Sequence, residues 1–226
     1  MIKNLINIFF PQVCYGCNNF LSDNEKYVCT RCRHELPVTN FHFDNKEAFK
    51  KTLYGRVKLV NATALLRFEK KGIVQQLLHK LKYKGYEDIG LFLGEWLGAE
   101  LKETGDYSDV DIVIPVPLHK RKLRKRGYNQ VEKFAKSIAE TLEVTYSDQA
   151  LQKSTSTATQ VFKKRIARWI DKDEVFTLVD ASLIENKHIL LCDDIITTGA
   201  TIEACANELL KAPNVKISVV TMAIAQ

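Results

Sequence analysis

The chain has 226 residues, of which 46% are hydrophobic and 27% charged, a composition ordinary for one globular domain or for a domain with a small appendage. No apolar run approaches the roughly 20 residues that cross a bilayer, so we expect a cytoplasmic protein without a membrane span. The net charge of +6 equals the six basic residues of one block, KRKLRKR (120–126), which favours a local anionic partner, with a solvated loop as the alternative.

The chain begins with MIKNLINIFFPQVCYGC, a short apolar patch that lacks the cleavage site of a signal peptide. We expect a packed N-terminal helix there.

Four of the six cysteines follow as two close pairs, Cys14-x2-Cys17 and Cys29-x2-Cys32, separated by eleven residues. This is the spacing of a zinc ribbon. Because sulfur fills all four ligand positions and leaves none for water, the spacing predicts a structural Zn²⁺ site. Two disulfides are the alternative, which a cytoplasmic location disfavours. We assign residues 1–45 to this zinc-binding module and residues 46–226 to a second domain.

A polar connector (42–51) joins the two domains, and the second domain then alternates strands with helices. We predict strands within 56–69, 110–117, 187–194 and 215–225, and helices within 72–86, 89–101, 129–142 and 201–211. The predicted strands are apolar on both faces. Such strands, when they alternate with helices, indicate an α/β fold with a parallel sheet that is covered on both sides.

Two adjacent acids, Asp193 and Asp194, end the strand at 187–194, where ligands bind in folds of this class. A loop of small and hydroxyl-bearing residues follows and opens a helix: Thr197, Thr198, Gly199, Ala200 and Thr201. Glycine lets the backbone turn closely, and the free N–H groups of a helix start hold phosphate. We therefore expect the acids to bind the 2′- and 3′-hydroxyls of a ribose, directly or through Mg²⁺, beside its own 5′-phosphate. Acids that merely cap a helix are the alternative.

The run from Ile189 through Thr201 resembles the phosphoribosyl pyrophosphate (PRPP) signature of type I phosphoribosyltransferases. Together with the cysteine module and the segments PVPLHKRKLRKRGYNQ (115–130) and TATQVFKKRIARWIDKDEVF (157–176), it makes nearly the whole chain similar to the ComF family. These are competence-associated, phosphoribosyltransferase-like proteins. Asp171 departs from the family, whose members usually have Asn there.

The resemblance implies a type I phosphoribosyltransferase-like sheet, with a hood at about 50–90 and a core at about 108–226. It also implies PRPP with Mg²⁺ as ligands, Asp193 and Asp194 as catalytic residues, and a role in DNA uptake during natural transformation. The turn after the strand at 110–117 is the expected pyrophosphate loop, with these candidate residues: Pro117, His119, Arg124, Arg126, Asn129 and Gln130. An exposed loop position is the alternative for His119.

Basic residues interleaved with aromatic ones suit single-stranded DNA, whose phosphates take the charges and whose bases stack on rings. The candidate DNA-binding residues are Lys120, Arg121, Lys122, Lys125, Lys163, Lys164, Arg165 and Arg168. Near the last four, a Trp169 that packs into the core is the plainer interpretation of the aromatic signal.

Two principal hypotheses stay open. The chain is either an enzyme that transfers phosphoribosyl from PRPP to an unknown acceptor, or a non-catalytic module that binds PRPP or a nucleotide and single-stranded DNA. In the second case the zinc ribbon would dock partners such as a DNA-uptake helicase or a membrane pore, and these would hold the protein at the inner membrane. A zinc-ribbon regulator with a vestigial pocket is a third hypothesis, weakened by the intact signature.

Overall fold

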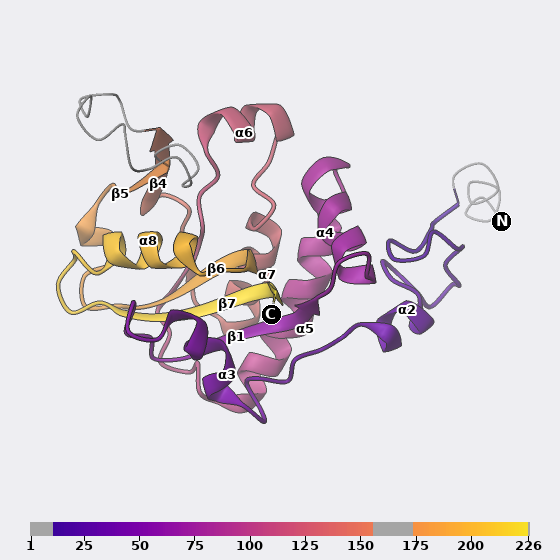
Figure 1. Ribbon diagram of the computed structural model, residues 1–226, viewed down its shortest axis with the longest axis horizontal. Helices are drawn as coiled ribbons and strands as arrows, with labels where there is room; N and C mark the ends of the chain where they lie inside the picture. Colours follow the sequence, from indigo (N-terminus) through magenta and orange to yellow (C-terminus); the bar gives the residue numbers. More distant parts are fainter. Residues whose placement is uncertain (1–10, 156–173, 226) are drawn as a thin grey trace.

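A five-stranded parallel sheet forms the centre of the computed structural model, which describes residues 11–155 and 174–225 (Figure 1). Its strands are β1 (Ala62–Phe68), β2 (Ile112–Pro115), β3 (Thr145–Tyr146), β6 (His188–Ile196) and β7 (Lys216–Ala225). They lie in the order β1-β7-β6-β2-β3, and every pairing is parallel. The predicted parallel sheet is confirmed.

Helices cover both faces of this sheet. One face carries α4 (Ile73–Tyr83), α5 (Asp88–Thr104) and α7 (Glu132–Leu142), and the other carries α8 (Ala200–Leu209). Shorter elements complete the fold: α2 (Thr30–Glu35), α3 (Lys46–Lys50), η1 (Lys51–Leu53), α6 (Lys120–Arg126), η2 (Ala181–Leu183) and the antiparallel pair β4 (Leu151–Thr155) and β5 (Glu174–Leu178). Within the described part of the chain, no helix is long and apolar enough to cross a membrane.

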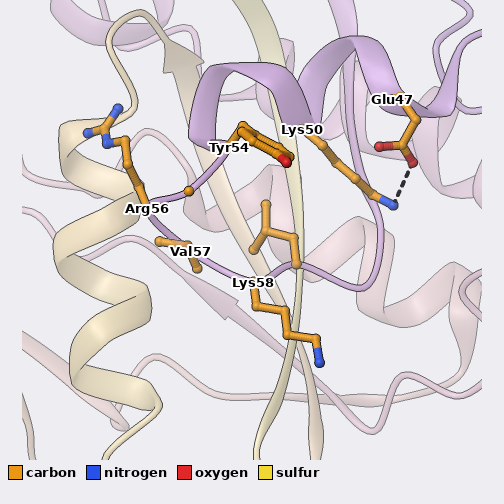
Figure 2. Close-up of a pocket in the computed structure, with 8 residues that line it drawn as sticks. Glu47, Lys50, Tyr54, Arg56, Val57 and Lys58 are labelled. Atoms are coloured by element: carbon orange, nitrogen blue, oxygen red, sulfur yellow. Dashed lines mark hydrogen bonds and ion pairs between the residues drawn. The ribbon is translucent and has the colours of Figure 1, made fainter.

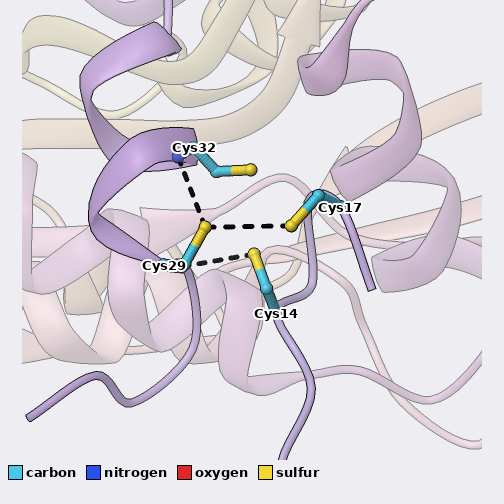
Figure 3. A group of neighbouring side chains, drawn as sticks. All are labelled: Cys14, Cys17, Cys29 and Cys32. Carbon is cyan, nitrogen blue, oxygen red and sulfur yellow. Dashed lines mark hydrogen bonds between the residues drawn. The ribbon is translucent and has the colours of Figure 1, made fainter. Parts of the chain in front are cut away.

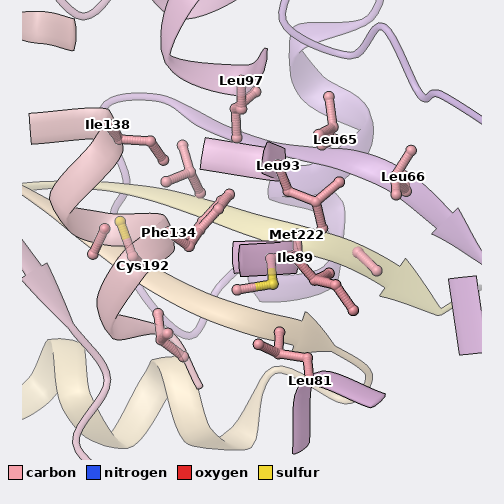
Figure 4. Close-up of a cluster of buried hydrophobic side chains, with 14 of the residues drawn as sticks. Leu65, Leu66, Leu81, Ile89, Leu93, Leu97, Phe134, Ile138, Cys192 and Met222 are labelled. Carbon is pink, nitrogen blue, oxygen red and sulfur yellow. The ribbon is translucent and has the colours of Figure 1, made fainter. Parts of the chain in front are cut away.

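Two buried clusters hold the layers together, one on each face. Figure 4 shows the first, in which Leu81, Leu93 and Phe134 from the helices meet Cys192 and Met222 from the sheet. The second lies under α8, α3 and η1. Residues alternate between the two clusters along β6, because successive side chains of a strand point to opposite faces.

The carboxyl ends of β2 and β6 border a crevice that the topology creates. From β2 the chain passes through α7 on one face to β3, whereas from β6 it passes through α8 on the opposite face to β7. The connections that follow these two neighbouring strands therefore cross opposite faces of the sheet. Such a switch point leaves a crevice outside the carboxyl ends, which is where ligands bind in α/β sheets.

The cysteine module packs directly on α4. Lys80 Nζ donates to Tyr15 O at 2.8 Å and to Asn18 Oδ1 at 2.6 Å, and both acceptors belong to the segment of the first cysteine pair. A Cβ on Gly16 would meet Ile73 Cδ1 at 2.9 Å. The module thus shares the first hydrophobic cluster with the sheet.

Several local features differ from the sequence-based expectations. The connector at 42–51 includes α3 and leads into η1, because Phe49 and Leu53 are fully buried against the second cluster. The basic block is the short helix α6 rather than a loop, and β6 continues past the acids to Ile196. The strands β4 and β5 were not predicted. The expected N-terminal helix falls on residues 1–10, outside the described residues.

Candidate phosphate-binding site

Asp193 and Asp194 lie side by side in β6 and are both buried, at 7% and 4% exposure. Asp194 accepts from Lys82 Nζ at 2.9 Å and from Gln130 Nε2 at 2.6 Å, so its carboxylate is held between α4 and the start of α7. The side chain of Asp193 points to the other face of the sheet and accepts from the backbone N–H of Asp194 at 2.8 Å. Within the described part of the chain, Asp194 is thus paired with a cation and Asp193 is not.

Burial raises the pKa of Asp193 to about 8, and the charge of neighbouring Asp194 adds to this effect. Lys82 and Lys153 act in the opposite direction and only partly offset it. Desolvation disfavours the ionised form of a carboxyl group, and a second carboxylate disfavours it further. Around neutral pH, Asp193 is therefore mostly protonated until a cation or another donor approaches it.

The loop after β6 has the geometry of an anion site. Thr197, Thr198, Ala200 and Thr201 are exposed, whereas Gly199 is buried and has φ of +79° at the N-terminus of α8. That left-handed conformation suits glycine. A helix start of this kind offers free N–H groups and the positive end of the helix dipole, which together favour a bound phosphate.

Arg56 braces this loop from outside. Its Nη1 donates to Thr198 O at 2.5 Å, and its Nε donates to Glu203 Oε2 in α8 at 2.8 Å. Figure 2 shows its side chain directed toward the helix and away from Lys58. Leu53 lies against the same loop, since a Cβ on Gly199 would come within 2.6 Å of Leu53 Cδ2. The segment before β1 therefore fixes the conformation of the loop.

The candidate pyrophosphate residues follow β2, and Gln130 reaches Asp194. Val116 N donates to Cys192 O at 2.8 Å, so the turn with Pro117 runs beside the acids. His119 caps α6, because its Nδ1 accepts from Arg121 N at 3.1 Å. Asn129 Nδ2 donates to Val116 O at 3.0 Å and so braces the turn. These contacts give His119 and Asn129 structural partners within the chain.

Arg126 and Gln130 form a relay to the acids, because Arg126 donates to Gln130 Oε1 and Gln130 donates to Asp194. Five of the basic residues of α6 are exposed: Lys120, Arg121, Lys122, Arg124 and Lys125. The remaining DNA-binding candidates, Lys163, Lys164, Arg165 and Arg168, lie outside the described residues, as do Trp169 and Asp171.

Sequence reasoning missed three residues at this site, namely Lys82, Arg56 and Tyr128. Lys82 is 112 positions before its partner Asp194, and Arg56 is 142 positions before Thr198. Tyr128 donates its hydroxyl to Leu81 O and so ties α4 to the segment between α6 and α7. Each acts through a long-range contact, so no local motif marks it.

The four cysteines of the N-terminal module converge as their spacing predicts (Figure 3). Their Sγ atoms all lie within 4.8 Å of one another, and those of Cys17 and Cys29 are 3.8 Å apart. Four thiolates around Zn²⁺ at about 2.3 Å form a tetrahedron whose edges are about 3.8 Å. The arrangement therefore fits a possible structural zinc site.

Backbone donors surround these sulfurs. Gly16 N and Cys29 N donate to Cys14 Sγ at 3.3 and 3.2 Å, and Cys32 N donates to Cys29 Sγ at 3.4 Å. Burial alone would raise the pKa of Cys14, but the N–H groups outweigh it and lower the pKa to about 7. All six cysteines are free thiols, so no disulfide competes with the metal site.

The sequence of the chain is similar to those of known proteins. Residues 130–225 match the family model described as a phosphoribosyl transferase domain. The chain is 25% identical over 202 residues to the DNA utilization protein YhgH of Escherichia coli strain K12, covering 88% of this chain and 84% of that protein. It is also 25% identical over 201 residues to the competence protein ComFC of Bacillus subtilis, covering 88% and 78%.

Among solved structures, the chain is similar to a purine phosphoribosyltransferase from Pyrococcus horikoshii, with a TM-score of 0.38 and 16% identity over 61% of this chain and 73% of that one. An adenine phosphoribosyltransferase gives a TM-score of 0.40 and 13% identity, over 65% and 74% of the two chains.

Proposed function

Because the chain belongs to the ComF family and has a type I phosphoribosyltransferase-like fold, we propose that it binds PRPP with Mg²⁺ and acts as a phosphoribosyltransferase in DNA uptake. One observation carries the proposal. Two buried acids lie at the carboxyl edge of β6, and an exposed phosphate-type loop follows them within three residues and opens the ten-residue helix α8.

The 5′-phosphate of PRPP would bind the N–H groups and hydroxyls of residues 197–201. Asp193 and Asp194 would accept hydrogen bonds from the ribose hydroxyls or would coordinate a Mg²⁺ ion, for which carboxylates are good ligands. Asp194 already has Lys82 and Gln130 as partners, and these fix its orientation. Among the described residues Asp193 forms no ion pair, which suits the carboxyl group that a ligand or ion would meet.

Loss of pyrophosphate from C1 develops positive charge on the ribose and negative charge on the leaving group. The carboxylates would stabilise the first, and the cations near the turn after β2 would stabilise the second. Mg²⁺ bound to the pyrophosphate would offset its remaining charge. The exposed cations that follow this turn include Lys120, Arg121 and Arg124.

The test is titration calorimetry of the zinc-loaded protein with PRPP and Mg²⁺. We expect saturable binding that Asp194→Asn weakens at least about tenfold, which corresponds to roughly 1.4 kcal/mol. Asp111→Asn is the matched control, because Asp111 accepts from His188 N at the opposite end of β6. Absence of PRPP binding by the unmodified chain, or equal effects of the two substitutions, would contradict the proposal.

The exposed cations of α6 support a second proposal, that the chain binds single-stranded DNA there. Five basic side chains on a seven-residue helix form a dense positive surface without a neighbouring acid in the same helix. Binding to phosphates would weaken steeply with salt, by a slope that reflects the number of contacts. Fluorescence anisotropy with a labelled oligonucleotide between low and high salt tests this, and salt-independent binding would rule it out.

The proposal of DNA-uptake partners, such as a helicase or a membrane pore, rests on the family and on the names of the relatives. The zinc module is the surface that we propose for them. A pull-down with the four cysteines intact, compared with a Cys14→Ser and Cys17→Ser variant, tests that role, and equal capture of the same uptake protein by both would contradict it.

A further inference from the structure

A second pocket opens between α4 and α6, next to the acids but outside the phosphate loop. We call it the α4–α6 pocket, and it measures about 360 Å³. Its lining includes four cations and two tyrosines: Lys82, Lys122, Lys125, Arg126, Tyr83 and Tyr128. A pocket of this volume falls in the range that holds small-molecule ligands.

The charge of the pocket points to an anionic ligand. Of the described residues that line it, none is acidic. Lys82 is paired with Asp194, and Arg126 donates to the neutral Gln130, so its positive charge is not cancelled by that bond. Lys125 is exposed at the rim. Several cations that converge on one small space match a phosphate group better than a single carboxylate.

The tyrosines point to an aromatic group on the same ligand. Tyr83 is 67% exposed, and the guanidinium of Arg126 lies 5.6 Å from its ring centroid. Tyr128 is fixed by its hydrogen bond to Leu81 O. Exposed aromatic rings beside cations stack on the bases of nucleotides.

We propose that the α4–α6 pocket binds a nucleoside phosphate beside PRPP. The inference rests on the proposed function in taking this molecule as the acceptor-side ligand. The pocket shares Lys82 with the acids, so its occupant would lie adjacent to the ribose of PRPP. A nucleoside phosphate combines the two groups that the lining selects, a phosphate for the cations and a ring for the tyrosines.

A larger pocket of about 510 Å³, shown in Figure 2, is less suited to a nucleoside phosphate, and its residues provide the control substitutions. It also has an exposed tyrosine, Tyr54, and three basic residues. However, Lys50 pairs with Glu47 at 3.1 Å, and Arg56 is engaged by Glu203. Acids thus offset two of its three cations, and a phosphate gains little there.

The experiment is calorimetric titration of the full chain with AMP, with adenosine and with inorganic phosphate as probes. We expect AMP to bind more tightly than adenosine or inorganic phosphate. We expect Tyr83→Ala and Lys125→Gln each to weaken the affinity for AMP about tenfold. Tyr54→Ala and Lys58→Gln are the matched controls from the larger pocket and should leave AMP affinity unchanged. Absence of AMP binding, or AMP binding that both Tyr83→Ala and Lys125→Gln leave intact, would overturn the proposal.

Titration in the presence of PRPP and Mg²⁺ separates this pocket from the pyrophosphate site. Simultaneous binding of AMP and PRPP supports it, whereas competitive displacement of AMP by PRPP or by pyrophosphate overturns it. If AMP binds in a Tyr83-dependent way but PRPP does not bind at all, the pocket is retained and the proposed function fails. A single-stranded oligonucleotide with a 5′-phosphate, compared with AMP, distinguishes the end of a strand from a free nucleotide as the source of the same group.

Discussion

Asp193 makes the stability of the fold sensitive to pH. Its pKa in the folded chain is about 8, raised from 3.8 by burial and by the charge of Asp194. The folded state therefore binds a proton that the unfolded state has released between these two values. By linkage, this stabilisation is complete below about pH 3.8 and is lost progressively as the pH rises toward 8.

We expect Asp193→Asn to reduce the fall in unfolding free energy between pH 5 and pH 8, because asparagine has no proton to lose. One proton changes the slope by at most about 1.4 kcal/mol per pH unit. Urea denaturation at several pH values measures the slope. Asp180→Asn is the control, since hydrogen bonds from Ser182 lower the pKa of that carboxyl group and keep its titration below the tested range. Equal slopes in the original chain and in Asp193→Asn would contradict the prediction.

Gly199 is required by both its backbone and its neighbours. We expect Gly199→Ala to destabilise the chain by more than the roughly 1–2 kcal/mol that a left-handed residue costs, because the new Cβ would also meet Leu53 Cδ2 at 2.6 Å. Gly55→Ala has a similar φ of +72° but no atom within 4 Å of its Cβ, so it isolates the strain. Thermal unfolding and PRPP titration of both variants test this, and equal losses of stability would show that Leu53 yields freely.

The acids and the phosphate loop could be predicted from sequence because they are contiguous and because their residue types are typical of a site for a ribose phosphate. The partners of these residues could not. Lys82 reads as one more lysine on the polar side of a helix, and only the packing of α4 against the carboxyl edge of the sheet brings it to Asp194. Local patterns therefore identified the groups that we propose for ligand binding, and long-range contacts decided how those groups are held.

At the scale of elements, the contact between α5 and α7 depends on glycines spaced four apart, Gly90, Gly94 and Gly98. Glycine inside a helix normally costs about 0.5–1 kcal/mol relative to alanine. At Gly94, however, a Cβ would lie 2.6 Å from Phe134 O, a backbone atom that cannot rotate away. The close approach of the two helices thus outweighs the usual preference for alanine.

We expect Gly94→Ala to destabilise the chain by about 1–3 kcal/mol, the usual cost of overpacking a core. Gly90→Ala should cost less, because its nearest neighbour is at 3.3 Å and small shifts relieve it. Chemical denaturation of the two variants gives the comparison. A stabilised Gly94→Ala would mean that α5 and α7 separate without penalty.

The long helices and strands could be predicted from the hydrophobic periodicity of the sequence, and the short ones could not. The predicted helices and strands around the sheet are present because each buries a continuous apolar face, which leaves a period in the sequence. α3 and η1 are too short for such a period, and their two anchors, Phe49 and Leu53, sit among charged residues. Among the strands that the structure describes, β4 and β5 pair only with each other, outside the main sheet, so neither has the two-sided apolar pattern of the buried strands.

At the scale of the whole molecule, α4 connects the cysteine module to the proposed PRPP site. Lys80 and Lys82 are two residues apart on this helix. Lys80 holds the first cysteine pair through Tyr15 O and Asn18 Oδ1, and Lys82 holds Asp194. The edge-on contact of Tyr15 with Tyr86, 4.8 Å between ring centroids, adds a second link just beyond the helix. A change in the module therefore has a short, packed route to the acids.

We expect removal of zinc by a chelator to lower the melting temperature. We also expect it to weaken the affinity for PRPP by about fivefold or more, which is the low end of typical coupling between sites. The reason is that Zn²⁺ would hold the four sulfurs together, and a module loosened by loss of the ion would release Lys80 and let α4 shift. Lys80→Met should reproduce part of the loss of PRPP affinity while zinc stays bound, which separates the link from the metal. Calorimetry with PRPP before and after chelation, and after zinc is restored, measures both effects. If the chelated protein melts earlier but binds PRPP as tightly as before, the module supports folding alone and α4 transmits nothing to the acids.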